Sequence, residues 1–381
     1  MQKLLNLQEL AARLKKVDIM IMELVLRRME LAEQVGNYKR QTGQPIFRSE
    51  IEDKRISEMR EWAEQHGVNP HFAESLEYLL INESCKLQMI RLQDEQLDQS
   101  DIQDEDAWYD ILKRNLLVLT ERWSESYDAN HDSYFATRAH FQFESDLIAS
   151  EIQKLSDHSL MLDLGCATGK TALKFAHLFY KVIGYDLSQH MLAKASESTE
   201  RAGLQDTVSF ECCDIEDGLP VLDSEASFVV MNLGTASDVR DIRHVFDETF
   251  RVLKIGGRFL FSFYNRDALM YRWDILPWST GLAATVNIHK DSLDVHSRNK
   301  EGVDEIVSVY ARAYTISEIE ALFADYLVNI EYSTHPTMSS ILPNELLLDQ
   351  HSVQDLVIAV DHKLLDAGAG AYIVVTGEKH S

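Results

Sequence analysis

The sequence predicts two folded modules: an all-α module of three helices, followed by an α/β module built on a mostly parallel, doubly wound sheet. Apolar residues in the first quarter of the chain recur at helical spacing, and short β-rich runs alternate with helical patterns in the rest. A stretch with eight acidic and no basic residues, Asp94 to Asp110, separates the two parts. We therefore expect a helical domain over residues 1–93, a linker with a connecting helix over 94–115, and the α/β domain over 116–381.

Composition narrows the range of partners. The 381 residues include 37 Lys and Arg against 62 Asp and Glu, and the resulting net charge of -25 repels nucleic acid and anionic membrane surfaces. The chain shows no apolar run long enough to span a bilayer and no signal peptide, so we expect a soluble, cytoplasmic protein with a small-molecule substrate. The cysteines are Cys85, Cys166, Cys212 and Cys213. They form no C-x-x-C pair, and we expect reduced thiols and no metal site.

The first predicted helix carries a heptad seam. Apolar residues at positions 7, 10, 14, 17, 21, 24, 31 and 35 alternate in steps of three and four, with Arg28 filling one slot. A helix of about 30 residues is ~45 Å long, too long to bury this seam against two shorter helices. We therefore expect a second copy of the chain to cover the seam in a homodimer. Gly43, Pro45, Gly67 and Pro70 separate this helix from the two that follow.

Polar residues at core positions indicate a pocket in the helical module. Arg28 lies in the seam, Lys39 follows it by three turns, Glu52 shares the apolar face of the second helix, and Ser84 and Gln88 lie one turn apart on the third. Burial of an unpaired cation is costly, so an anion must compensate Arg28. That anion is either a ligand held by these five residues or a carboxylate of the bundle itself, with the other side chains on solvated faces.

The same residues carry a resemblance to a known family. The segments "LAEQVGNYKRQTGQPIF" and "NESCKLQ", with Arg28 and Glu52, resemble the all-α chorismate mutases. The resemblance implies three helices that interlock as a dimer and rearrange chorismate to prephenate by orientation and electrostatic stabilisation. It also implies that Arg28 and Lys39 hold the carboxylates and ether oxygen of the substrate, that Gln88 is a second donor to the ether oxygen, and that Glu52 and Ser84 contact the hydroxyl and a carboxylate.

This chain departs from the family pattern at three positions. Ala11 stands where the family has an arginine that reaches into the partner's site, and Arg48 and Ile51 stand where it has an aspartate and an arginine. Two expected cations are therefore missing, and Arg13 lies about 200° around the helix from the first of them. The module is expected to be a weak mutase, a binder of a related dicarboxylate, or a dimerisation scaffold.

A glycine loop opens the second module. The segment "LMLDLGCATGK" predicts a strand, a tight loop and a helix, and the small residues of the loop let a ligand approach the backbone. Its D-x-G-x-A-x-G pattern consists of Asp163, Gly165, Ala167 and Gly169. Asp186, followed by Leu187, ends the next strand, where a carboxylate can accept both hydroxyls of a ribose. These features are typical of the nucleoside-binding half of a doubly wound sheet.

Two cofactor classes compete for such a loop, a nicotinamide dinucleotide and S-adenosyl-L-methionine. The loop is not G-x-G-x-x-G, and Asp163 is an awkward neighbour for a pyrophosphate but suits the methionine ammonium. The next strand ends at Asp214, placed to accept from an adenine amino group while Ile215 covers the ring, and the following strand ends at Asn232. This order resembles the Rossmann-like class I methyltransferases over about residues 120–381. The resemblance implies S-adenosyl-L-methionine as cofactor, with contacts from these residues, from the loop and from Asp186 and Leu187.

Lid residues are expected in the segments above the carboxyl ends of the strands, including an inserted, β-rich flap. The candidates are Tyr127, Tyr134, Arg138, Tyr264, Asn265, Arg266 and Arg272, with His140 and His244 as possible bases. Arg138 and Arg272 could hold a substrate carboxylate. For each of these residues a purely structural role is the alternative.

Together these features predict an S-adenosyl-L-methionine-dependent methyltransferase of specialised metabolism. Its acceptor is expected to be a small, carboxylate-bearing metabolite, and its helical module a mutase-like domain that dimerises. Two alternatives stand beside this prediction. In one, the mutase-like domain only pairs two methyltransferase domains. In the other, it supplies prephenate for modification of the cofactor itself.

Overall fold

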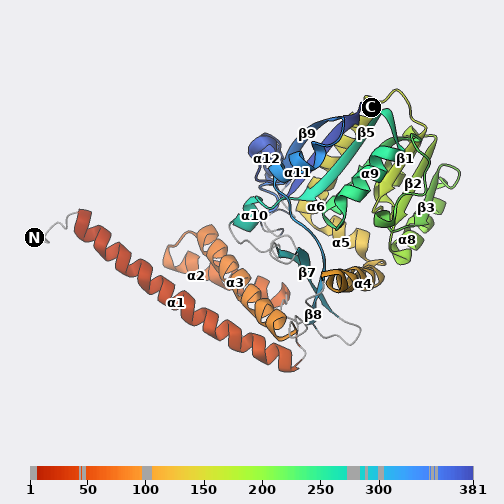
Figure 1. Cartoon of the computed structure of the whole chain (residues 1–381). Coiled ribbons are helices and arrows are strands. Elements are labelled where there is room, and N and C mark those ends of the chain that lie inside the picture. Colours follow the sequence, from red (N-terminus) through yellow and green to blue (C-terminus); the bar gives the residue numbers. More distant parts are fainter. Residues whose placement is uncertain are drawn as a thin grey trace, which may run out of the picture. The chain divides into compact units, whose positions relative to one another are not determined.

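The structure, a computed structural model, describes residues 7–42, 44, 49–96, 105–272, 284–287, 291–298, 304–342, 344, 347 and 351–380. The chain divides into two compact units, one of residues 1–103 with 296–306 and the other of residues 104–295 with 307–381. Helices alone form the amino-terminal part, and a large sheet lies in the carboxyl-terminal part (Figure 1). The predicted fold class, an all-α domain followed by an α/β Rossmann-like domain, is confirmed.

Three helices make up most of the first unit. They are α1 (Leu7–Thr42), α2 (Ser49–His66) and α3 (Pro70–Gln96). Ala63 of α2 and Ala73 of α3 are at most 5% exposed. Such small side chains let the two helices approach closely along their shared face.

The seam of α1 is exposed in the single chain. Leu14 and Leu24 are each 65% exposed, and Figure 1 shows α1 extending well past α2 and α3. A continuous apolar stripe of this length is unfavourable in water. It is the kind of surface that a partner chain covers.

Three helices precede the sheet of the second unit. They are α4 (Glu105–Trp123), α5 (Tyr127–Ser133) and α6 (Phe135–Gln153). Leu112 and Leu119 of α4 are buried, so one apolar face holds this helix in its unit. The helix begins inside the segment that composition predicts as a linker and continues without a break into the predicted α/β domain.

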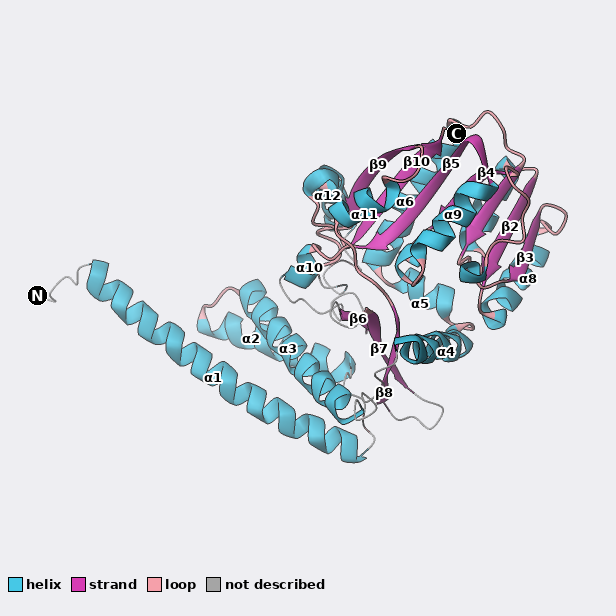
Figure 2. Cartoon of the chain, in the orientation of Figure 1, coloured by secondary structure: helices cyan, strands magenta, loops and turns pink. Residues whose placement is uncertain are grey.

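A seven-stranded sheet forms the centre of the second unit (Figure 2), with the order β3-β2-β1-β4-β5-β10-β9. The strands are β1 (Leu160–Leu164), β2 (Lys181–Asp186), β3 (Val208–Cys212), β4 (Ala226–Met231), β5 (Leu253–Tyr264), β9 (Val328–His335) and β10 (Tyr372–Lys379). β1 to β5 are parallel to one another, and β10 is antiparallel to both of its neighbours. The chain moves outward from β1 in both directions, so the switch point at which such sheets bind ligands lies between β1 and β4.

Helices cover both faces of this sheet (Figure 2). The remaining helices are α7 (Lys170–Phe175), α8 (Gln189–Ala202), α9 (Ile242–Val252), α10 (Leu269–Arg272), α11 (Ile316–Phe323) and α12 (His351–Lys363). Successive residues of β1 pack to opposite sides, because Met161 belongs to the same core as Phe175, and Leu162 to the same core as Phe246. Burial on both faces explains the continuous apolar runs of the central strands.

The insertion predicted as a β-rich flap contains a second, three-stranded sheet in the order β6-β7-β8. Its strands are β6 (Ala284–Asn287), β7 (Ser292–Arg298) and β8 (Asp304–Tyr310). Among the helices of the described ranges, none combines the length and apolar character that crossing a bilayer requires. All four cysteines lie in the described ranges, and they are free thiols as predicted.

Candidate functional site

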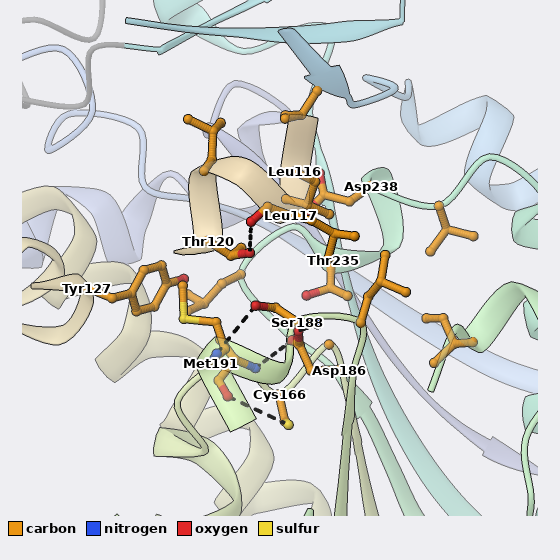
Figure 3. A pocket seen from close by; sticks show the side chains of 18 of the residues that line it. Leu116, Leu117, Thr120, Tyr127, Cys166, Asp186, Ser188, Met191, Thr235 and Asp238 are labelled. Atoms are coloured by element: carbon orange, nitrogen blue, oxygen red, sulfur yellow. Dashed lines mark hydrogen bonds between the residues drawn. The ribbon is translucent and has the colours of Figure 1, made fainter. Parts of the chain in front are cut away.

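A cavity of about 350 Å³ lies at the carboxyl ends of the first four strands (Figure 3). Its lining includes Gly165 after β1, Leu187 after β2, Asp214 after β3 and Asn232 after β4. Parallel strands end at the same edge of a sheet, so residues far apart in the sequence meet here. Helices α4 and α5 and strands β7 and β8 contribute further parts of the wall, together with single residues such as Phe141, Met191 and Tyr264.

The loop after β1 is a tight turn fixed to the neighbouring strand. The amides of Gly165 and Cys166 both donate to the Tyr185 carbonyl, at 2.8 and 3.0 Å. Gly169 is the N-cap of α7 and has a φ of 77°, and a Cβ at this position would lie 2.4 Å from the Phe210 ring. Only glycine satisfies both the backbone angle and the packing.

Asp163, on β1, is fully buried behind this loop and does not itself line the cavity. Its Oδ2 accepts from the Ala172 amide at 3.1 Å, whereas Oδ1 has no hydrogen-bond partner among the described residues. Burial raises the pKa of Asp163 to about 7, against the opposing effect of the Ala172 bond. An unpaired oxygen of a buried carboxylate is unfavourable, and a positive charge in the adjacent cavity would reduce this cost.

Asp186 ends β2 and lines the cavity directly, next to Leu187. Its two oxygens accept from the amides of Ala167 and Ser188, both at 2.8 Å. Burial raises the pKa of Asp186, and the two backbone bonds oppose this shift. Each carboxylate oxygen retains a second lone pair, so the side chain can still accept from hydroxyl donors of a ligand.

An ion cluster lies beside the end of β3. Lys113 of α4 pairs with Asp214, and its Nζ lies 3.3 Å from Oε2 of Glu216. The hydroxyl of Tyr109 donates to the same Glu216 carboxylate. Burial lowers the pKa of Lys113, but the bonds with Asp214 and Glu216 outweigh burial, so the pKa is raised. Sequence reasoning missed Tyr109 and Lys113 because both lie in the segment predicted as a linker.

A buried acid holds the turn after β4. Nδ2 of Asn232 donates to Oγ1 of Thr171 at 2.6 Å. The next residue, Leu233, has a φ of 53° and donates its amide to Oε2 of Glu144 at 2.8 Å. Glu144, on α6, is fully buried and thereby positions the turn that carries Asn232. The sequence offered no signal for it, since the two partners are separated by 89 positions.

Of the predicted lid residues Tyr127, Tyr134, Arg138 and Tyr264, some line the cavity and others do not. Tyr127 lines the cavity, as does Tyr264 at the end of β5. Tyr134 and Arg138 do not line it, and Nη1 of Arg138 donates instead to the Asp132 carbonyl at 2.6 Å. The structure therefore brings the two tyrosines to the cavity and gives Arg138 a backbone partner elsewhere.

The lid residues after β5 have structural contacts. Asn265 is fully buried, and its Nδ2 donates to two backbone carbonyls before β10, at 2.7 and 3.0 Å. Arg266 pairs with Glu318 at 3.1 Å, and neither Asn265 nor Arg266 lines the cavity. The side chain of Arg272 lies outside the described residues.

The two candidate histidine bases also lie away from the cavity lining. His140 is buried, with Nε2 at 3.0 Å from Oε1 of Glu144 and Nδ1 at 3.3 Å from Nδ1 of His335. His244 is exposed on α9, and its amide is bonded by the helix cap of Asp241. Neither histidine is therefore placed to act on a ligand of the cavity.

A separate polar cluster surrounds Arg28 in the first unit. Its Nη1 donates to the Leu80 carbonyl at 2.5 Å and to the Ser84 hydroxyl, and its Nη2 lies 3.6 Å from Oε1 of Glu77. Arg55 pairs with the same oxygen of Glu77 at 2.8 Å. Burial lowers the pKa of Arg28, and the Glu77 charge opposes this shift. A carboxylate of the bundle therefore compensates Arg28, which is one of the two alternatives that the sequence left open.

Two further predicted residues, Lys39 and Gln88, are only 5% and 4% exposed. Oε1 of Gln88 and Nη2 of Arg28 are buried and have no hydrogen-bond partner among the described residues. Polar atoms of this kind mark a place where a ligand could donate or accept. The side chain of Glu52 and the whole of Arg48 lie outside the described residues.

Two family models match the chain. Residues 10–89 match the model of chorismate mutase type II, and residues 161–257 match the model of a methyltransferase domain. The chain thus contains one region that matches chorismate mutase type II and a later region that matches a methyltransferase domain. Both resemblances stated from the sequence are confirmed at the level of the family.

Curated relatives are similar over part of their length. The tRNA 5-carboxymethoxyuridine methyltransferase of Escherichia coli (strain K12) is 31% identical over 110 residues, which are 29% of this chain and 42% of that protein. The S-adenosyl-L-methionine-dependent Diels-Alderase iccD of Talaromyces variabilis is 34% identical over 104 residues, 26% of this chain and 35% of that protein. The chain thus spans less than half the length of either relative.

A solved structure with a similar fold is that of geranyl diphosphate C-methyltransferase from Streptomyces coelicolor A3(2) in complex with Mg²⁺, geranyl diphosphate and S-adenosyl-L-homocysteine. The superposition has a TM-score of 0.42 at 16% sequence identity, and it covers 62% of this chain and 78% of that one.

Proposed function

We propose that the second unit transfers a methyl group from S-adenosyl-L-methionine to a small molecule. The observation that carries this proposal is the convergence of polar strand ends, after β1 to β4, on one cavity. Asp186 would accept the ribose hydroxyls, Asp214 the adenine amino group, and Ile215 would cover the adenine ring. The bound cofactor supplies an electrophilic methyl group, while the protein orients the acceptor and excludes water.

The residues present fit this cofactor. Asp163 keeps one buried oxygen without a partner in the described structure, and a carboxylate there favours the ammonium and sulfonium charges. A Cβ on Gly165 would lie 2.4 Å from Thr235, so the loop leaves no room for a side chain between it and the opposite wall. Asp214 would share its oxygens between the adenine amino group and Lys113, which keeps Glu216 as a second partner.

We propose a small molecule rather than a tRNA as acceptor, although one relative is named as a tRNA methyltransferase. The net charge of -25 opposes the approach of a polyanion. The two lysines of the described lining, Lys113 and Lys170, are already paired with Asp214 and Asp132. We do not retain the carboxylate expected on the acceptor, because Arg138 does not line the cavity and both lining lysines are paired.

Calorimetry of the full chain with S-adenosyl-L-methionine and S-adenosyl-L-homocysteine tests the proposal. We expect both to bind, and we expect Asp186→Ala to weaken binding by about tenfold or more, since it removes charge-assisted bonds to the ribose. Asp206→Ala, an exposed change outside the cavity, is the matched control and should bind as the unchanged protein does. Absence of binding to the unchanged, folded protein would refute the proposal.

For the first unit we propose a homodimer formed through α1 and, as a second candidate activity, rearrangement of chorismate to prephenate. The exposed seam supports the first, and the buried cluster of Arg28, Ser84 and Gln88 supports the second. Arg28, Lys39 and Gln88 would hold the substrate in a compact conformation, which this rearrangement requires. The two alternatives remain a domain that only pairs methyltransferase units and one that supplies prephenate for modification of the cofactor.

Loss of chorismate absorbance separates these possibilities. We expect Arg28→Ala to remove any mutase activity, while Arg13→Ala, an exposed change on the same helix, leaves it intact. If the unchanged protein consumes no chorismate, pairing of methyltransferase units would be the role that remains for this unit. A gain of mass on the cofactor after incubation with chorismate would instead favour the cofactor-modifying role.

A further inference from the structure

The cavity has an apolar half that contains one carboxylate outside the cofactor contacts. Leucines and valines of α4, β7 and β8 line this half: Leu116, Leu117, Leu293, Val295 and Val309. In Figure 3, Asp238 is drawn on the side of Leu116 and Leu117, and Thr235 lies between it and Asp186. Asp238 thus lies on the far side of the cavity from the proposed ribose site.

A turn fixed by hydrogen bonds holds Asp238 in place. The residue follows the short 3-10 helix Thr235–Ser237, and its amide donates to the Thr235 carbonyl at 3.0 Å. The Ser237 carbonyl accepts from the Arg312 amide and its hydroxyl from the Tyr264 amide, both at 2.8 Å. A side-chain hydrogen bond also joins Tyr264 to Asp238. The carboxylate is therefore preorganised toward the cavity, as a catalytic group requires.

The electrostatic surroundings connect this carboxylate to the cofactor side. Burial raises the pKa of Asp238 to about 8, and the bond with Tyr264 opposes the shift. Burial, followed by the charges of Asp186, Asp128 and Asp238, raises the pKa of Tyr127 to about 12. Asp186 and Asp238 thus both act electrostatically on Tyr127, which lines the same cavity.

No cation of the described lining neutralises Asp238. Lys113 and Lys170 are paired with other acids, and burial lowers the pKa of His131 to about 4, which leaves its imidazole neutral. Tyr264 is the polar partner of Asp238, and the lining of the same cavity includes Tyr127 and the apolar side chains of α4 and the small sheet. A substrate carboxylate would be repelled here. An ammonium would be held as a cation, without the free electron pair that methyl transfer needs.

We propose that Asp238 is the general base of the methyl transfer and that the acceptor presents an aromatic hydroxyl on an otherwise apolar molecule. This inference rests on the proposed function. The acceptor oxygen forms a bond to the methyl carbon, the carbon–sulfur bond breaks with its electron pair remaining on sulfur, and the hydroxyl proton passes to Asp238. The products are the methyl ether, S-adenosyl-L-homocysteine and a protonated carboxyl group, which releases its proton to water.

Three probes of similar shape test the inference: 4-methylphenol, 4-methylbenzylamine, which is an ammonium at neutral pH, and 4-methylbenzoate, each incubated with the full chain and S-adenosyl-L-methionine. Mass spectrometry then follows the transfer of one methyl group. We expect the phenol to be methylated in preference to the other two. We also expect Asp238→Asn to lower its rate by about a hundredfold, the low end of general-base contributions, while cofactor affinity stays within about twofold. Asp217→Asn, an exposed change outside the lining, is the matched control.

The pH profile provides a second readout. In the unchanged protein the rate should rise with pH and level off above about pH 8, where Asp238 is ionised. In Asp238→Asn this rise should disappear. Cofactor binding without methylation of the phenol, a preference for the amine or the carboxylate, or an unchanged profile in the variant would each overturn the inference. Absence of cofactor binding would instead refute the proposed function.

Discussion

Replacing Asp163 by asparagine should stabilise the ligand-free second unit at neutral and alkaline pH. In the unfolded chain an aspartate has a pKa of about 3.9, whereas burial on β1 raises the pKa of Asp163 to about 7. The gap of about 3 units, at ~1.36 kcal/mol each, is worth about 4 kcal/mol. Because the folded state binds this proton more tightly, the contribution of Asp163 to stability falls as pH rises from about 4 to about 7 and is constant above that range.

Asparagine keeps the shape of the protonated acid and can still accept from the Ala172 amide, which Oδ2 does at 3.1 Å. We therefore expect Asp163→Asn to match the unchanged protein near pH 4 and to exceed it by up to about 4 kcal/mol near pH 8. Hydrogen exchange of the β1 amides in the full chain measures this opening free energy. Asp206→Asn, an exposed change, controls for the loss of one charge. A difference that does not grow with pH, or a variant less stable at pH 8, would refute the reasoning.

Two further predictions concern packing. Gly169→Ala should lower the thermal midpoint of the second unit by an amount equivalent to about 1 to 3 kcal/mol. Gly203→Ala should cost less, because Gly203 has a similar φ but no atom within 4 Å of an added Cβ. Equal costs would mean that the Phe210 contact is unimportant. Leu14→Glu places a charge in the exposed seam and should convert the dimer to a monomer in sedimentation experiments without loss of helicity; a persistent dimer would exclude the seam as the interface.

The sheet and its ligand-binding edge could be predicted because their signals are local. Buried strands read as short apolar runs, and each acidic or amide residue that follows one, such as Asp186 or Asn232, must emerge at the same edge. Helix α4 could not be predicted as part of the wall. Its contacts from Tyr109 and Lys113 to Glu216 span more than 100 positions, and the acidic composition around them indicated a linker. The helical spacing of the apolar residues indicates a face that contains Leu112 and Leu119, but it does not indicate the surface against which that face packs.

In the helical unit, one missed residue did leave a signal. Glu77 lies seven positions before Ser84, and therefore on the same face of α3, where a buried acid could meet Arg28. The prediction named a bundle carboxylate as an alternative without locating it. Arg55 was harder to find. The family pattern led us to expect a cation at the position of Ile51, and Arg55 lies four positions, or about one helical turn, further along the chain.

Glu77 bears on how far the helical unit keeps the chemistry of its family. Its carboxylate contacts both Arg28 and Arg55, so the Arg28 guanidinium is compensated without any ligand. A dianion such as chorismate would have to share Arg28 with this buried acid, and the like-charge repulsion is strong where water is excluded. Dimerisation through α1 does not depend on that balance, because the seam is apolar and lies on the exposed surface. Of the two roles proposed for this unit, pairing is therefore the one that a compensated Arg28 leaves intact. The methyl transfer proposed for the second unit requires neither this arginine nor chorismate.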